Sequence, residues 1–151
     1  MTSTEPSHAS RLQPQGDPIS NLAARTDLPE ALGRALAAFE AIRQLARRYE
    51  DREPDLFAAF MSAASAAAEG RDAILTASAL PTPDVTAVEI GTSAPDAKAA
   101  DVADMIAAEA AALAVELDRA VTLARSDLDR RACHDAATAA RQIHQLLAAE
   151  P

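Results

Sequence analysis

Residues 28–49, LPEALGRALAAFEAIRQLARRY, carry the most regular pattern in this chain of 151 residues. Apolar side chains recur there every three or four positions, at Leu28, Leu32, Ala35, Phe39, Ile42, Ala46 and Tyr49. This spacing places them along one side of an α-helix, the side that packs against neighbouring helices. Pro29 suits the first turn of a helix, and Pro54 disfavours helical conformation at the residue before it. The stretch therefore predicts one amphipathic helix that begins at Asp27 or Leu28 and stops at residues 51–53.

Apolar residues continue at helical spacing beyond Pro54, so a second helix is expected to start at Pro54 or Asp55. Its inner side is expected to consist of Phe57, Phe60 or Met61, Ala64, Ala67, Ile74 and Leu75. Gly70 lies within this helix and costs ~1 kcal/mol relative to alanine, so the helix either tolerates it or kinks there. Because the connection is short, the first two helices should form an antiparallel hairpin.

The third helix is expected from about Pro95 to Arg125, and the fourth from an N-cap at Ser126. Their apolar stripes are Ala99, Val102, Ile106, Ala110, Leu113, Leu117, Ala120 or Val121, and Ala124, followed by Leu128, Ala132, Ala136, Ala139, Ile143, Leu146 and Leu147. One continuous helix over residues 96–149 is the alternative. It would be ~80 Å long at 1.5 Å per residue, too long for the shorter helices to cover in a monomer. We therefore expect a break at residues 125–127.

Two proline-containing segments flank or separate these helices. Residues 1–27 combine prolines, Gly16 and polar residues without a helical period, which predicts a disordered N-terminal tail. Residues 81–95 contain three further prolines around the segment DVTAVEI, whose β-branched residues should pack onto the bundle. The prediction is an all-α fold: a four-helix antiparallel bundle domain over residues 28–150, in up-down-up-down order, with a long connection between helices 2 and 3.

Charge and composition narrow the classes of function. The formal net charge of −9 makes the chain a poor candidate for nucleic-acid binding, which depends on phosphate neutralisation by Lys and Arg. Cys133 is the only cysteine, so no intrachain disulfide can form. No uncharged apolar run reaches the ~18 residues of a membrane-spanning helix, and the polar N-terminus lacks the pattern of a secretory signal. A cytoplasmic location without membrane association is therefore expected.

Four arginines near the end of the first helix form the candidate binding site: Arg43, Arg47, Arg48 and Arg52. They make two pairs spaced four residues apart, which suggests that both pairs line one flank of the helix. Such a flank would anchor an acidic protein, a phosphate or a carboxylate. The alternative is that these cations stabilise the helix C-terminus and are neutralised by acidic neighbours in residues 40–53.

Residues 84–118 contain eight acidic residues and a single basic one, Lys98. The third helix is therefore expected to form the negative face of the molecule. This face would bind a basic partner or the arginines of another copy. The alternative is a solvated helix surface that maintains solubility.

Catalytic motifs are weak or missing in this sequence. Di-iron four-helix bundles need Glu-x-x-His pairs, but Arg131 precedes His134 and Arg141 precedes His144 at that spacing. Cys133 and His134 are adjacent, so on a helix they diverge by ~100° and do not form a nucleophile–base pair. Gly-rich phosphate loops and serine-hydrolase or zinc motifs are also absent from the sequence. We expect no catalytic residue, metal or cofactor.

The leading functional hypothesis is a non-enzymatic interaction module, meaning a small adaptor, regulator or assembly subunit. It binds a protein partner or associates with itself, with a homodimer as one form, because alanine-rich helices bury more area on pairing. The alternative is a bundle that holds a small apolar ligand or cofactor beside Phe57, Phe60 and Met61. An enzyme with a metal or thiol site is the third hypothesis.

Overall fold

The computed structural model describes residues 27–81 and 97–148 of the chain. Within these ranges the structure is all-α, as predicted. The four helices are α2 (Leu28–Tyr49), α3 (Phe57–Leu75), α4 (Ala99–Leu123) and α5 (Asp127–Leu147), and the 3-10 helix η2 (Pro54–Leu56) leads into α3. The expected tail, apart from Asp27, and the expected connection at 81–95, apart from Pro81, lie outside the described residues.

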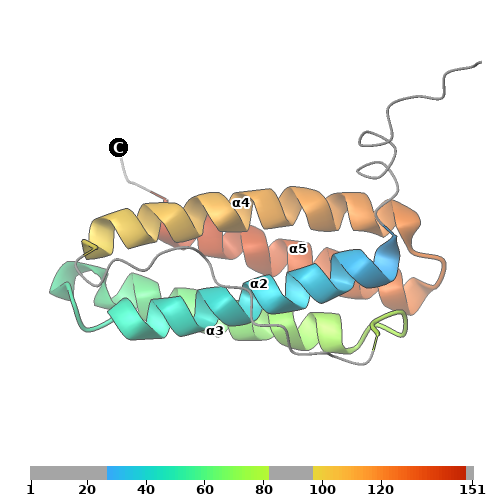
Figure 1. Ribbon diagram of the computed structural model, residues 1–151, viewed down its shortest axis with the longest axis horizontal. Helices are drawn as coiled ribbons and strands as arrows, with labels where there is room; N and C mark the ends of the chain where they lie inside the picture. The colour runs from blue at the N-terminus through green and yellow to red at the C-terminus, as the bar shows by residue number, and fades with distance from the viewer. Residues whose placement is uncertain (1–26, 82–96, 149–151) are drawn as a thin grey trace, which may run out of the picture.

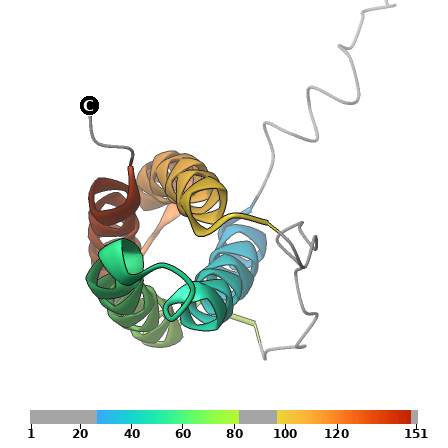
Figure 2. The same cartoon turned by 90° about the vertical axis from the view of Figure 1, so that its left-hand side faces the viewer.

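The helices pack side by side in the order α2, α3, α5, α4 around the bundle (Figures 1 and 2). Each pair of neighbours runs in opposite directions, but α3 and α4 lie on a diagonal and run in the same direction (Figure 1). The up-down-up-down order is therefore wrong. Both α3 and α4 end beside the beginning of α5, because Asp129 contacts Ser78 and Arg130 contacts Ala124.

Local signals account for the helix boundaries. The side chain of Asp27 accepts a hydrogen bond from the backbone amide of Glu30 at 3.0 Å and caps α2, which ends at Tyr49, slightly before the expected residues. Ser126 caps α5 by accepting from the amide of Asp129 at 3.1 Å, so the break between α4 and α5 lies where it was predicted. Helix α4 begins at Ala99 rather than at Pro95.

The core is built from alanine with a few large side chains between the helices. The largest residues without exposed surface include Leu32, Phe39, Ile42, Phe60, Ile74, Ile106, Leu117 and Ile143. Three residues expected on the inner sides, Phe57, Leu75 and Leu128, are instead 40–50% exposed. Two of them lie at the first or last residue of α3, and Leu128 lies in the first turn of α5.

Gly70 allows α2 and α3 to approach closely. A Cβ atom at Gly70 would lie 2.3 Å from the ring of Phe39, a separation that real atoms do not reach. Phe39 has no exposed surface, so its ring has little room to move away. Helix α3 continues through Gly70 from Phe57 to Leu75, so the helix tolerates this glycine because the fold needs the space.

Gly70→Ala should destabilise the protein by ~1–2 kcal/mol, because overpacking outweighs the ~1 kcal/mol gain in helix propensity. Gly33→Ala is the matched control, since nothing lies within 4 Å of its Cβ position in α2. It should stabilise the protein by up to ~1 kcal/mol. Urea denaturation followed by circular dichroism measures both changes. Stabilisation by both substitutions would contradict this account of Gly70.

Asp129 is the one buried charged residue among the described positions. Its Oδ1 accepts hydrogen bonds from the backbone amides of Ser78 (2.7 Å) and Ala79 (3.3 Å), and the hydroxyl of Ser78 donates to the same carboxylate at 3.0 Å. Burial alone would raise the pKa of Asp129, but the hydrogen bonds from Ser78, Ala79 and Ser126 outweigh it and hold this pKa below its usual value. These hydrogen bonds thus connect the turn after α3 to the first turn of α5.

Asp129→Ala should lower the free energy of unfolding by ~2–3 kcal/mol, because part-buried amides lose a charged acceptor. Asp127→Ala removes a carboxylate from the same turn, where it is exposed and pairs only with Arg130. It should cause a much smaller loss. Equal losses for the two variants in urea denaturation would show that the contacts with Ser78 and Ala79 contribute little.

Candidate interaction surface

The outward side of α3 has an unusual composition for a protein of this net charge. Residues 57–68, FAAFMSAASAAA, include no charged side chain. Five of them are exposed: Phe57, Ala58, Met61, Ser62 and Ser65. We call these five residues the α3 face. The two largest, Phe57 and Met61, keep 40% and 47% of their surface in contact with solvent.

The α3 face forms most of an open depression of about 370 Å³. Ala66 and Glu69 of α3 and Gln142 of α5 complete its lining. The contributed groups are an aromatic ring, a thioether, small apolar groups, two hydroxyls, one amide and one carboxylate. Glu69 is the one charged side chain in this lining.

The position of the α3 face follows from the packing of α3. Small residues at Ala63, Ala67 and Gly70 turn inward, and Phe60 fills the core between them. Helix α2 covers one side of α3 and α5 covers the other. The remaining side is left uncovered by the helices that the structure describes, and it holds the α3 face.

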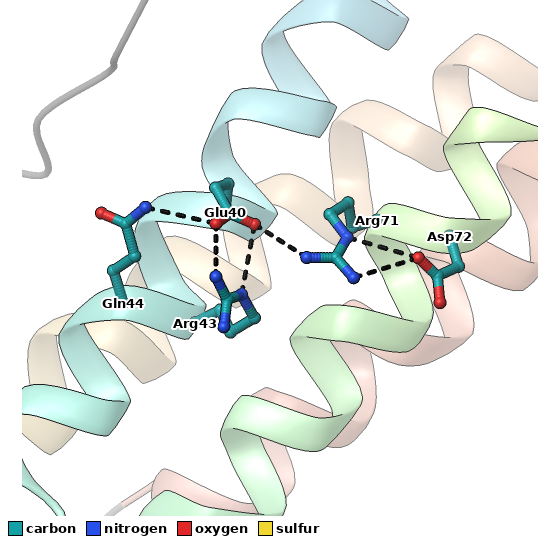
Figure 3. Close-up of polar contacts among 5 residues, drawn as sticks. All are labelled: Glu40, Arg43, Gln44, Arg71 and Asp72. Atoms are coloured by element: carbon teal, nitrogen blue, oxygen red, sulfur yellow. Dashed lines mark hydrogen bonds and ion pairs between the residues drawn. The ribbon is translucent and has the colours of Figure 1, made fainter.

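An ion network marks the edge where α2 meets α3 (Figure 3). Glu40 of α2 accepts hydrogen bonds from Arg43 Nη2 at 2.6 Å, from Gln44 Nε2 at 3.2 Å and from Arg71 Nη1 of α3 at 3.1 Å. Arg71 Nη2 also donates to Asp72 at 3.2 Å. The Arg43 hydrogen bond lowers the pKa of Glu40 to about 2, helped by Gln44 and Arg71 and opposed by burial.

The four arginines of the predicted site do not share one surface. Arg43 is bound to Glu40, and the guanidinium of Arg52 lies 4.9 Å from the centre of the Tyr49 ring. Arg47 and Arg48 are exposed and form no ion pair with any residue in 27–81 or 97–148. Adjacent helical residues diverge by ~100°, so Arg47 follows Arg43 on the side toward α3, whereas Arg48 points away from it.

In α4, the helix expected to form the negative face, some acidic side chains form ion pairs and others are exposed. Asp118 of α4 pairs with Arg141 of α5 at 3.1 Å, whereas Glu109 and Glu116 are exposed. Three acids of the expected negative stretch, at positions 84, 89 and 96, lie outside the described residues. The described acids thus serve partly as helix–helix contacts and partly as solvated charge.

Cys133 and His144, two other titratable residues considered from the sequence, take part in contacts between helices. Cys133 is fully buried, and burial followed by the charge of Asp129 raises the pKa of its thiol. The ring Nδ1 of His144 lies 3.1 Å from the carbonyl oxygen of Ala107 and bonds α5 to α4. Across the described part of the chain, no group of three or more His, Cys, Asp or Glu side chains could hold a metal ion.

The three residues expected around an internal ligand are divided between core and surface. Phe60 has no exposed surface, whereas Phe57 and Met61 belong to the α3 face. Phe57 and Met61 therefore line an external depression, not the interior proposed from the sequence. The sequence signal for the α3 face is the twelve-residue run without charge at residues 57–68.

No protein-family model matches this sequence, and no curated protein or solved structure is detectably similar to it. None of the helices in the described ranges has both the length and the apolar character needed to cross a membrane.

Glu40→Gln should lower stability at pH 7 by ~1 kcal/mol, because ion pairs at partly exposed positions contribute about that much. The depressed pKa of Glu40 gives stability that is complete above pH ~4.5 and is lost as the pH falls toward about 2. The difference between variant and wild type should therefore shrink over this interval. Urea denaturation at a series of pH values measures it, with Glu116→Gln as a control for the loss of one exposed charge. A Glu40→Gln difference that is the same at every pH would contradict the explanation.

Proposed function

We propose that this protein is a non-catalytic interaction module, a small cytoplasmic adaptor, regulator or assembly subunit that binds another protein chain through the α3 face. The observation that carries the proposal is the uncharged, half-exposed surface around Phe57 and Met61 on a protein of net charge −9. Leaving such groups in water has no benefit for the folded monomer, and covering them by a partner is favourable.

The composition of the α3 face supports this assignment. Aromatic residues and methionine are enriched in the centres of protein interfaces, and charged residues are depleted there. Phe57 and Met61 belong to the enriched types, the other three residues of the α3 face are small, and no charged residue lies within the face. Charged groups begin around it, with Asp55 before Phe57, Arg47 on α2 and Glu69 further along α3. Charges in such rim positions guide the choice and orientation of a partner more than they add affinity.

Net charge supports a protein partner over a nucleic acid. Binding to a phosphate backbone requires a concentration of Lys and Arg on one surface. Here Arg43, Arg71, Arg130 and Arg141 are each engaged by a carboxylate of the same chain. Other exposed arginines without an ion pair among the described residues are divided between α2 (Arg34, Arg47, Arg48), the segment after it (Arg52), α4 (Arg119), the turn between α4 and α5 (Arg125) and α5 (Arg131). This spread over several elements, on a chain of net charge −9, gives no support for a single phosphate-binding surface.

Met61→Glu should reduce partner binding at least tenfold, because it places a charge at the centre of a surface that must lose water. Val115→Glu is the matched control, since Val115 is 51% exposed on α4, away from the α3 face. The measurement compares the amount of any stoichiometric partner recovered from the native lysate by full-length wild type and by both variants. Circular dichroism verifies that the helices are intact. Equal recovery by wild type and Met61→Glu would remove the α3 face from the proposal.

A further inference from the structure

We propose that the partner of the α3 face is a second copy of this chain, with the two α3 helices side by side in the same direction. The two copies are related by a twofold axis parallel to these helices. This inference rests on the proposed function, because it uses the same surface, and it adds the identity and orientation of the partner. It is carried by the different charges on the two sides of the α3 face.

The side of the α3 face next to α2 is basic. Contact between Glu40 and Arg71 shows which side of α2 lies against α3. Arg43 also binds Glu40, and Arg47 follows one turn later on that side of the helix. Arg47 is exposed and makes no ion pair within the described residues, so its guanidinium is available to another chain.

The side of the α3 face next to α5 is acidic. Glu69 lines the depression together with Gln142 of α5, which fixes Glu69 on that side of α3. Glu69 is exposed, and no arginine or lysine among the described residues pairs with it. Along the two flanks of α3 there is therefore one available cation, Arg47, and one available carboxylate, Glu69, on opposite sides, whereas the exposed acids Glu53 and Asp55 lie before the first residue of the face.

Symmetry decides which orientation uses these charges. A twofold axis parallel to α3 places the α2 side of each copy opposite the α5 side of the other, so that Arg47 meets Glu69 twice. An axis perpendicular to α3 places α2 opposite α2, which brings the two Arg47 side chains together. The parallel arrangement is therefore favoured over the antiparallel one.

The heights of the two residues along the bundle agree with this pairing. Glu40 is level with Arg71, and α2 runs opposite to α3. Arg47 is seven residues beyond Glu40, about 10 Å along the axis, which places it near the level of residue 64. Glu69 of the second copy then lies about 8 Å further along the axis, and an arginine and a glutamate side chain are both long enough to lean toward each other across this axial offset.

The centre of the contact is suited to two close helices. Ala58, Ser62 and Ser65 are small and let the backbones approach, while Phe57 and Met61 supply apolar area. Each copy has a net charge of −9, so self-association requires a contact without opposed carboxylates, and residues 57–68 provide it. The contact should end before Asp72, where equal carboxylates would face each other, each already bound by its own Arg71.

Sedimentation equilibrium of the full-length protein, from about 1 to 300 µM, tests the proposal. Because the contact is about one helix wide, it belongs to the small interfaces, and we expect a dimer with a dissociation constant in the micromolar range. Arg47→Glu and Glu69→Arg should each weaken dimerisation about tenfold or more, since each opposes like charges. The double variant R47E/E69R should recover affinity to within about threefold of wild type, because the pair is restored with its charges exchanged.

Arg48→Glu is the matched control, because it makes the same charge change one residue away, on the side of α2 that points away from α3. It should leave dimerisation within about twofold of wild type. A wild-type protein that is monomeric over the whole range would overturn the inference. So would an effect of Arg48→Glu equal to that of Arg47→Glu, or a double variant as weak as the single ones.

The two proposals fail in different ways. A monomeric wild type that still loses a captured protein when Met61 is changed to Glu overturns the second copy as partner but keeps the α3 face as an interface. A dimer that forms equally well with Met61→Glu overturns the inference, since the copies then meet elsewhere. A dimer that is abolished by Met61→Glu and rescued by R47E/E69R supports both.

Discussion

The carboxylate of Asp129 determines how the helices are arranged around the bundle. It joins the turn after α3 to the first turn of α5, which are 51 residues apart in the sequence. Because α3 must end where α5 begins, and α4 leads directly into α5, α3 and α4 both finish at this end of the molecule. Helix α4 therefore begins at the end of the bundle opposite to the one where α3 finishes, and α3 is a neighbour of α5 rather than of α4.

Alanine sets the second constraint, which is close packing with few large side chains. Small residues on the inner sides of the helices let the backbones approach, and the few large residues must then fit where space remains. Gly70 of α3 has no side chain, and the aromatic ring of Phe39 from α2 fills the space that a side chain would take there. Helix α3 packs small residues against both α2 and α5, and its large residues Phe57 and Met61 remain on the uncovered side. The packing that closes the core therefore also produces the α3 face.

Local sequence signals predicted the helices well but could not predict their surfaces. Asp27 and Ser126 cap helices through bonds to residues three positions away, so the starts of α2 and α5 could be read from the sequence. Phe57 was wrongly placed in the core, because a stretch without charges has no polar side to contrast with an apolar one. The spatial order of the helices depends on the contact between Ser78 and Asp129, for which no local pattern exists. The separation of Arg47 from Arg48 follows from helical geometry and could have been predicted.

Cys133 lies one turn beyond Asp129 and has no surface in contact with solvent. Its raised pKa keeps the sulfur in the thiol form, which reacts poorly with alkylating reagents, and the neighbouring helices exclude those reagents. Each alkylation of this single sulfur therefore records a transient separation of α5 from the other helices. The rate of Cys133 alkylation, followed by mass spectrometry, thus reports how often this part of the bundle opens. The measurement needs no introduced label, because the cysteine is native and lies close to Asp129.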